Sequence, residues 1–208
     1  MAADNHAGRS ARTRKRVVLP VVLIVLAGLA APIVSREVWL LREQSNIHHL
    51  HEEARRLGGD AEIPEGGIDY WGWRIQLIVD LSNSKVGDEE LARLQRMPGF
   101  QHLSMLSLAG SRITDKSLKL LESYPGLISV NLSHTGVTDK GLESLAKLPS
   151  LSNINLSGTN VTDAGLDALI RSRRYLVGVD LTKTKVTAEG LRRFSEAFPQ
   201  VYITPDRR

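Results

Sequence analysis

The stretch that decides the fold is residues 103–174, in which one pattern occurs three times. Leu103–Gly126 reads LSMLSLAGSRITDKSLKLLESYPG, Leu127–Ser150 reads LISVNLSHTGVTDKGLESLAKLPS, and Leu151–Arg174 reads LSNINLSGTNVTDAGLDALIRSRR. Weaker copies precede and follow these three. The leucines that close the five short apolar runs lie 27, 24, 24 and 25 residues apart: Leu81, Leu108, Leu132, Leu156 and Leu181. A period of this length indicates structural repeats that stack on one another.

Each repeat predicts a strand, a turn and a helix. Apolar residues alternate up to the closing leucine, as they do in a strand with one buried face. A hydroxyl residue follows three positions later, at Ser84, Ser111, Thr135, Thr159 and Thr184. We expect this hydroxyl to satisfy backbone groups in the turn. The next Thr-Asp pair predicts a helix start, with the threonine as cap and Asp115, Asp139 or Asp163 complementing the helix dipole.

No single repeat can bury its apolar edge alone, so the repeats must stack into a curved α/β solenoid. The pattern L-x-x-L-x-L-x-x-T-x-V-T-D-x-G-L-x-x-L resembles the cysteine-containing class of leucine-rich repeats, with Thr in place of Cys. The resemblance covers Gln76 to Ile203. It implies a leucine-rich-repeat solenoid, a short horseshoe of about five repeats, with a parallel sheet inside and helices outside. It also implies interaction rather than catalysis.

The N-terminal 35 residues predict a single transmembrane helix. Val17 to Val34 reads VVLPVVLIVLAGLAAPIV, which contains no charge and would span about 27 Å as a helix. Residues 1–16 hold five of the 27 basic side chains and one of the 23 acidic ones, so the other 192 residues are neutral. By the positive-inside rule, residues 1–16 form a basic cytoplasmic tail and residues 17–35 an uncleaved signal anchor. The alternative is a signal peptide cleaved before Ala31.

The external part is similar to a group of bacterial membrane-anchored repeat proteins. Leu57-Gly58-Gly59 matches the end of their stalk, and Pro199 to Ile203 matches their closing strand. We therefore expect a helical stalk at residues 36–58, a linker at 59–69 and the repeat domain at 70–208, on the outer, periplasmic side of the cell (inner) membrane.

An apolar stripe in the predicted stalk leaves two roles open. Leu40, Ile47 and Ala54 recur every seven residues, with Leu50 and Leu57 at the complementary positions. The stripe would pair two chains into a homodimer, or it would lie on the membrane or on the next domain.

The exposed face of the sheet is the predicted binding surface. Alternation along the strands places two columns of small, nearly uncharged side chains on this face. The residues of these columns that we predict to bind a ligand are Asp80, Met105, Ser107, Ser129, Asn131, Asn153, Asn155 and Asp180. The predicted ligand is an external protein, a peptide or a glycan. Tyr70, Trp71 and Trp73 either cap the open end of the solenoid or supply aromatic anchors.

The sequence favours a non-enzyme without a cofactor. It has no cysteine, which excludes thiol nucleophiles and zinc-thiolate sites, and it has no phosphate loop or dinucleotide motif. Asp80 and Asp180 would lie about 19 Å apart, beyond the ~5 to 9.5 Å of paired glycosidase carboxylates. The external location disfavours nucleic acid. The alternative to an interaction module is a structural protein of the cell envelope that dimerises through its stalk.

Overall fold

A computed structural model describes residues 38–65, 68, 75–172 and 175–204. The chain divides into two compact units, Met1–Arg42 and Glu43–Arg208. In the first unit the described residues, 38–42, are helical. The predicted tail and membrane helix, residues 1–16 and 17–35, lie outside the described residues. Within the described ranges no helix has the length and apolar character needed to span a bilayer.

The second unit is built on a sheet of seven strands that follow one another in sequence order. The strands are β1 (Asp60–Glu62), β2 (Leu77–Asp80), β3 (Leu103–Ser107), β4 (Ser129–Asn131), β5 (Asn153–Asn155), β6 (Gly178–Asp180) and β7 (Tyr202–Thr204). β1 pairs with β2 antiparallel, and every later pair is parallel. The predicted parallel sheet of about five repeats is therefore confirmed, with β7 as a closing strand.

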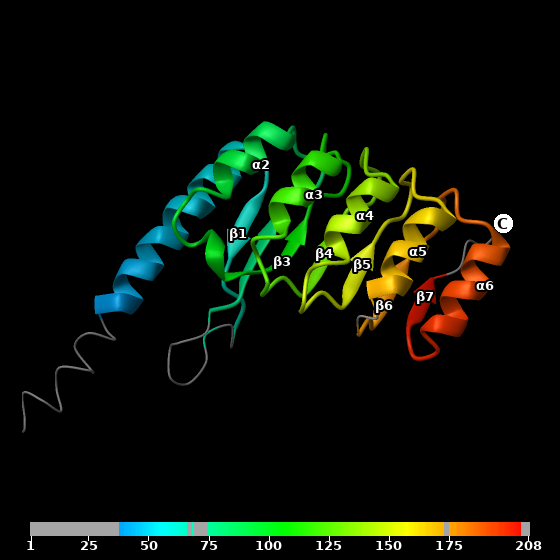
Figure 1. Cartoon of the computed structure of the whole chain (residues 1–208). Helices are drawn as coiled ribbons and strands as arrows, with labels where there is room; N and C mark the ends of the chain where they lie inside the picture. The colour runs from blue at the N-terminus through cyan, green and yellow to red at the C-terminus, as the bar shows by residue number, and fades with distance from the viewer. Residues whose placement is uncertain (1–37, 66–67, 69–74, 173–174, 205–208) are drawn as a thin grey trace, which may run out of the picture. The chain divides into compact units, whose positions relative to one another are not determined.

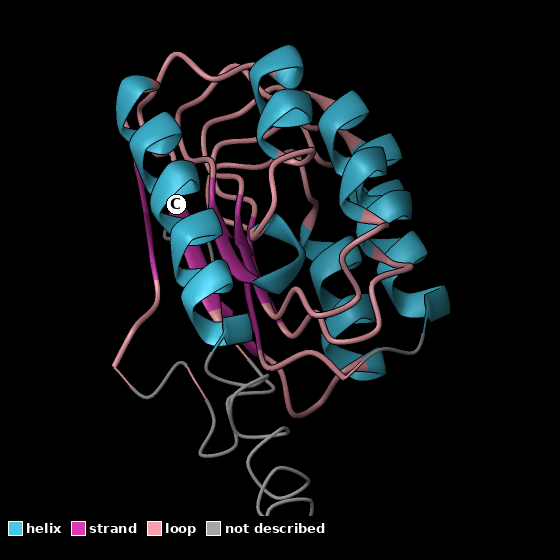
Figure 2. Ribbon diagram, turned by 90° about the vertical axis from the view of Figure 1, so that its left-hand side faces the viewer, coloured by secondary structure: helices cyan, strands magenta, loops and turns pink. Residues whose placement is uncertain are grey.

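The helices of the repeats line one side of the sheet (Figures 1 and 2). They are α2 (Asp88–Leu94), α3 (Asp115–Leu121), α4 (Asp139–Leu145), α5 (Asp163–Ser172) and α6 (Ala188–Ala197), and a short 3-10 turn, η1 (Phe100–His102), precedes β3. The core lies between the two layers. The first four closing leucines of the repeats are fully buried, and Leu181 is 5% exposed. Burial of these side chains between layers drives the stacking.

The turn after each strand is held by the recurring hydroxyl, as predicted. In all five repeats the Ser or Thr hydroxyl donates to the carbonyl of the closing leucine three residues earlier, at 2.6–2.7 Å. The intervening residue two positions after that leucine has φ between 54° and 68° in every repeat, and it is Asn83, Gly110, His134, Gly158 or Lys183. This left-handed position favours glycine or asparagine. The hydroxyl therefore closes a turn that the backbone alone would not favour.

The aspartate that begins each of the helices α2 to α5 joins its repeat to the next one, a role that the sequence analysis did not predict. In Asp139, Oδ1 accepts the backbone N–H of Thr162 at 2.8 Å and Oδ2 accepts the Thr162 hydroxyl at 2.7 Å. The same pair of bonds joins Asp88 to Thr114, Asp115 to Thr138 and Asp163 to Thr187. We call these four carboxylate–threonine pairs the aspartate ladder.

The aspartate ladder requires close approach of the next helix. A Cβ on Gly141 would lie 2.6 Å from Asp115 Oδ1, and one on Gly165 would lie 2.5 Å from Asp139 Oδ1. In α3 the equivalent residue is Ser117, whose hydroxyl instead donates to Asp88 Oδ1 at 2.5 Å. The predicted threonine caps form at Thr114, Thr162 and Thr187, whereas the Thr138 side chain makes no cap bond.

Part of the predicted stalk and linker belongs to the compact unit of the repeats. Residues 43–56 are helical and belong to the same compact unit as the repeats. Ile47, Leu50 and Ala54, three members of the predicted stripe, are buried in that unit at 7%, 0% and 0% exposure. Within the predicted linker, Asp60–Glu62 form β1 and extend the sheet. The compact unit that contains the repeats begins at Glu43.

The structure places the stripe against the chain's own repeats, which differs from the dimerising alternative. A Cβ on Gly99, just before η1, would lie 3.3 Å from Ile47 Cγ1. The helix at residues 43–56 therefore packs directly on the first repeats. Glu43 is 5% exposed, and its Oε1 accepts from Gln101 Nε2 at 2.7 Å and lies 2.7 Å from His102 Nε2. The three buried stripe residues are covered within one chain, so a homodimer through them would require the helix to leave the solenoid.

Candidate functional site

The predicted binding columns are aligned by the strand register. Met105, Ser129, Asn153 and Gly178 are consecutive Cα partners, and so are the members of the second column, Asp80, Ser107, Asn131, Asn155 and Asp180. Alternation with a period of two was enough to predict both columns. Their role in binding stays a prediction.

The closing strand adds two residues that the sequence analysis missed. Tyr202 is the register partner of Gly178, and Thr204 is the partner of Asp180. Tyr202 therefore continues the first column, and its side chain is 72% exposed. The sequence signal was the continuation of the period by 24 residues from Gly178 to Tyr202, but β7 lacks a closing leucine. The face thus carries an aromatic residue, which the columns taken from the repeats alone did not.

The second column stabilises the turns with one atom of each polar side chain. Asn131 Oδ1 accepts the backbone N–H of Ser133 at 3.1 Å, and Asn155 Oδ1 accepts that of Ser157 at 2.9 Å. Asp80 and Asp180 accept equivalent bonds two residues on, and the Ser107 hydroxyl pairs with that of Ser82 at 2.6 Å. Such side-chain turns are an ordinary use of Asn and Asp. Each amide or carboxylate still has a second polar atom that this turn does not use.

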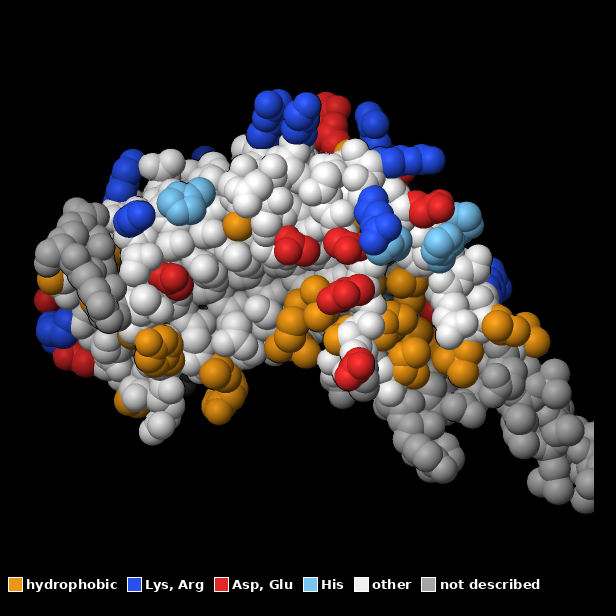
Figure 3. Space-filling model, turned by 180° about the vertical axis from the view of Figure 1, so that it is seen from behind, with side chains coloured by type: hydrophobic (Ala, Val, Ile, Leu, Met, Phe, Trp, Pro, Cys, Tyr) orange, Lys and Arg blue, Asp and Glu red, His pale blue; other side chains and the backbone are white. Residues whose placement is uncertain are grey.

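A shallow hollow of about 320 Å³ lies on this face over β4 to β7. It brings together five of the predicted residues and Tyr202: Ser129, Asn131, Asn153, Asn155, Asp180 and Tyr202. Asp80, Met105 and Ser107 lie beyond it, on β2 and β3. Figure 3 shows this side of the molecule, where uncharged polar and backbone atoms dominate and lysine and arginine side chains gather along the upper rim. The hollow is at the lower end of the ~300–1,000 Å³ typical of ligand sites.

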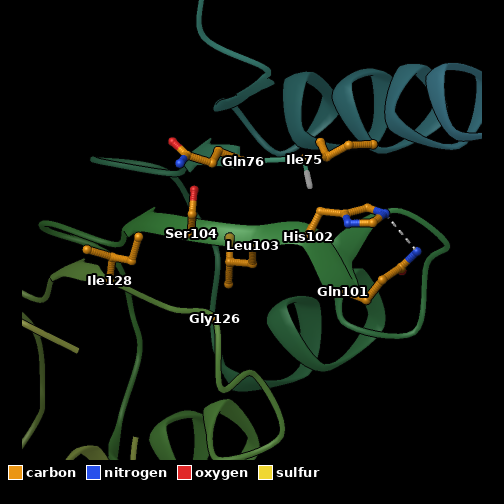
Figure 4. Close-up of a pocket in the computed structure, with 8 residues that line it drawn as sticks. All are labelled: Ile75, Gln76, Gln101, His102, Leu103, Ser104, Gly126 and Ile128. Atoms are coloured by element: carbon orange, nitrogen blue, oxygen red, sulfur yellow. Dashed lines mark hydrogen bonds between the residues drawn. The ribbon is translucent and has the colours of Figure 1, made fainter. Parts of the chain in front are cut away.

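A second hollow, of about 200 Å³, lies near the start of β3, between Ile75, His102, Ser104 and Ile128 (Figure 4). Three of its polar side chains have partners within the protein. His102 and Gln101 contact Glu43, and the Ser104 hydroxyl donates to the Leu77 carbonyl at 3.0 Å. These bonds attach the 43–56 helix to the repeats, so the residues have a structural role here.

Neither hollow contains the groups of a familiar hydrolytic or metal site. Among the described residues, Asp180 is the one carboxylate that lines the hollow over β4–β7. His134, which the sequence places between Ser133 and Thr135, lies over the backbone of the next repeat, because a Cβ on Gly158 would lie 2.5 Å from its Nδ1. In the part of the chain that the structure describes, no three His, Asp or Glu side chains are grouped to hold a metal ion. The predicted aromatic residues Tyr70, Trp71 and Trp73 lie outside that part.

Comparison with known proteins agrees with the architecture. The family model described as Leucine Rich repeat matches residues 127–146 and 147–169. Residues 127–169 therefore match leucine-rich repeats in sequence. Proteins of this family are typically not catalytic. No curated protein matches the chain significantly.

Among solved structures, the repeat protein is similar to an internalin from Listeria monocytogenes. The two share 17% sequence identity with a TM-score of 0.35. The match covers 61% of this chain and 48% of the internalin chain, so this chain spans about half the length of that structure.

Proposed function

We propose that this leucine-rich-repeat protein is anchored in the cell membrane by residues 17–35 and uses the exposed sheet face to bind a partner outside the cytoplasm. The observation that supports the binding role most is the register of the two columns. They form a continuous surface whose polar side chains each keep an unused hydrogen-bonding atom. The uncharged segment from Val17 to Val34 and the basic residues before it support the anchor and its orientation.

The binding role is tested by crosslinking in living cells from single sites. A photoreactive phenylalanine analogue replaces Ser129, which lines the hollow, or Lys140, which is exposed on α4. We expect a specific crosslinked product from position 129 and none from position 140. A product from position 140 alone would place the interaction on the helical side and contradict the proposed binding face.

The topology is tested with an alkaline phosphatase fusion, since this enzyme is active only outside the bacterial cytoplasm. We expect activity when the phosphatase follows Arg208 and no activity when it follows Arg16. An inactive fusion at Arg208, with the fusion protein present at normal level, would contradict the proposed orientation. Carbonate extraction distinguishes the uncleaved anchor from a cleaved signal peptide, because the anchored chain stays in the membrane pellet.

A further inference from the structure

The hollow over β4 to β7 presents hydrogen-bond donors from two strands. Asn131 and Asn155 each use Oδ1 to accept a backbone N–H of their own turn. This fixes the orientation of the amide and leaves the Nδ2 group as a donor. Within the described residues, neither Nδ2 group donates to another protein atom. The two residues are register partners on β4 and β5, whose backbones lie about 4.8 Å apart, the spacing of adjacent strands, so the two donors belong to neighbouring positions on the face.

Acceptors lie on the adjoining positions. Asn153 Nδ2 donates to the Ser152 hydroxyl at 3.0 Å, which leaves Oδ1 free to accept. This oxygen lies above Gly178, since a Cβ there would be 3.1 Å from it. In Asp180, Oδ1 accepts from the backbone and hydroxyl of Thr182, and Oδ2 has no partner among the described residues. Donors on β4 and β5 therefore lie beside acceptors on β5 and β6.

An aromatic side chain borders this polar surface. Tyr202 lies opposite Gly178 in the register, and its ring is largely exposed. Because Gly178 has no side chain, the floor of the hollow beside Tyr202 is backbone, with Asn153 Oδ1 above it. An exposed ring at the edge of a polar hollow offers an apolar surface for a flat ligand whose edges carry polar groups.

A sugar has the chemistry that fits all three features. Each sugar hydroxyl both donates and accepts hydrogen bonds, so the hydroxyls of one sugar can bind neighbouring donors and acceptors. The C–H face of a pyranose ring is apolar and can lie on a tyrosine. Among the residues that the structure describes, no lysine or arginine lines the hollow, and Asp180 would repel an anion. A peptide added as a strand would need a free sheet edge, whereas this face presents side chains.

We propose that the hollow over β4–β7 is a binding site for a neutral saccharide, with Tyr202 under a sugar ring and Asn131, Asn153, Asn155 and Asp180 bound to its hydroxyls. This inference rests on the proposed function, because it assigns a ligand class to the same sheet face. The open, shallow site predicts weak binding, with Kd on the order of 1 mM.

The test uses the full chain in a polyoxyethylene detergent, because detergents with sugar headgroups would compete. The probes are cellotetraose, maltotetraose and the tetramer of N-acetylglucosamine, and binding is followed by saturation-transfer NMR and titration. We expect at least one probe to bind. Tyr202→Ala should weaken that binding about fivefold or more through loss of the stacked ring. Gly178→Val should abolish it by filling the floor of the hollow.

Tyr175→Ala is the matched control, since Tyr175 is 80% exposed but does not line the hollow. It should bind the probe like the unaltered chain. Far-UV circular dichroism and the thermal midpoint show that each variant is folded. Binding that is equal in Tyr202→Ala and Tyr175→Ala, or no binding of any probe at about 10 mM, overturns the saccharide assignment. A protein crosslinked from position 129 without saccharide binding overturns this assignment alone and leaves the proposed function standing.

Discussion

The aspartate ladder predicts that one carboxylate in the middle of the solenoid has a large effect on stability. Asp139→Ala removes both acceptors of Thr162, the backbone bond of 2.8 Å and the hydroxyl bond of 2.7 Å. The net contribution of one hydrogen bond to the free energy of unfolding is about 1 kcal/mol, and it is larger when the acceptor is charged. Loss of a negative charge from the first turn of α4 adds about 0.3–1 kcal/mol. We therefore expect the free energy of unfolding to fall by about 2–3 kcal/mol.

Urea unfolding of the full chain in detergent, followed by circular dichroism at 222 nm, measures this change. Thr162→Val removes the hydroxyl but keeps the backbone donor, so about 1 kcal/mol of loss is expected. In the double variant the two losses should not add, since both act on one contact. Because repeats are stabilised by nearest-neighbour interfaces, Asp139→Ala should also broaden the transition.

Lys140→Ala is the control, because Lys140 is an exposed neighbour on the same helix. Its effect should stay within about 0.5 kcal/mol. If Asp139→Ala were no more destabilising than Lys140→Ala, or if its loss added fully to that of Thr162→Val, the aspartate ladder would not couple the repeats energetically.

Three further predictions concern the aspartate ladder and the helix at residues 43–56. Hydrogen bonds from the hydroxyl and backbone N–H of Thr187 lower the pKa of Asp163 below its usual 3.8. The stability that this carboxylate contributes is therefore present above pH 3.8 and is lost as the pH falls through the lowered pKa. Asp163→Asn should make stability depend less on pH in the acid range, and an unchanged dependence would contradict this prediction. Gly141→Ala places a Cβ 2.6 Å from Asp115 Oδ1 and should cost about 1–3 kcal/mol in urea unfolding, whereas a neutral effect would mean that the carboxylate is free to move. Leu50→Ala should lower the free energy of unfolding by about 2–5 kcal/mol, and with it the thermal midpoint, because this fully buried side chain packs within the unit of the repeats. An unchanged midpoint would indicate that the helix at residues 43–56 does not stabilise the repeats.

The repeats could be predicted because their information is local. The closing leucines, the alternation before them and the hydroxyl three residues later lie within one strand and turn, and the structure confirms each of these features. The two columns of the sheet face followed from the same alternation. Tyr202 was missed because β7 keeps the period but lacks the leucine that marked the other repeats.

Contacts between repeats could not be predicted in the same way. The sequence indicates that Asp139 begins a helix, and a local helix dipole explains that position adequately. Its bonds to Thr162 join residues 23 positions apart and depend on how closely successive helices pack. The glycine at position 165 allows this approach, but a glycine inside a helix has no single meaning in sequence.

The solenoid of about five repeats could be predicted from the amino-acid sequence, because apolar side chains with a period of about 24 residues can be buried only by stacking. The sequence also shows where charge and hydropathy change along the chain. What covers the apolar stripe at Ile47, Leu50 and Ala54 became known from the packing of the folded chain. A stripe of that kind fits a second chain, a membrane or the chain's own repeats equally well. The helix that carries the stripe precedes the first repeat in the chain, so it can cover the apolar end of the solenoid. Burial within one chain also avoids the entropy lost when two molecules associate.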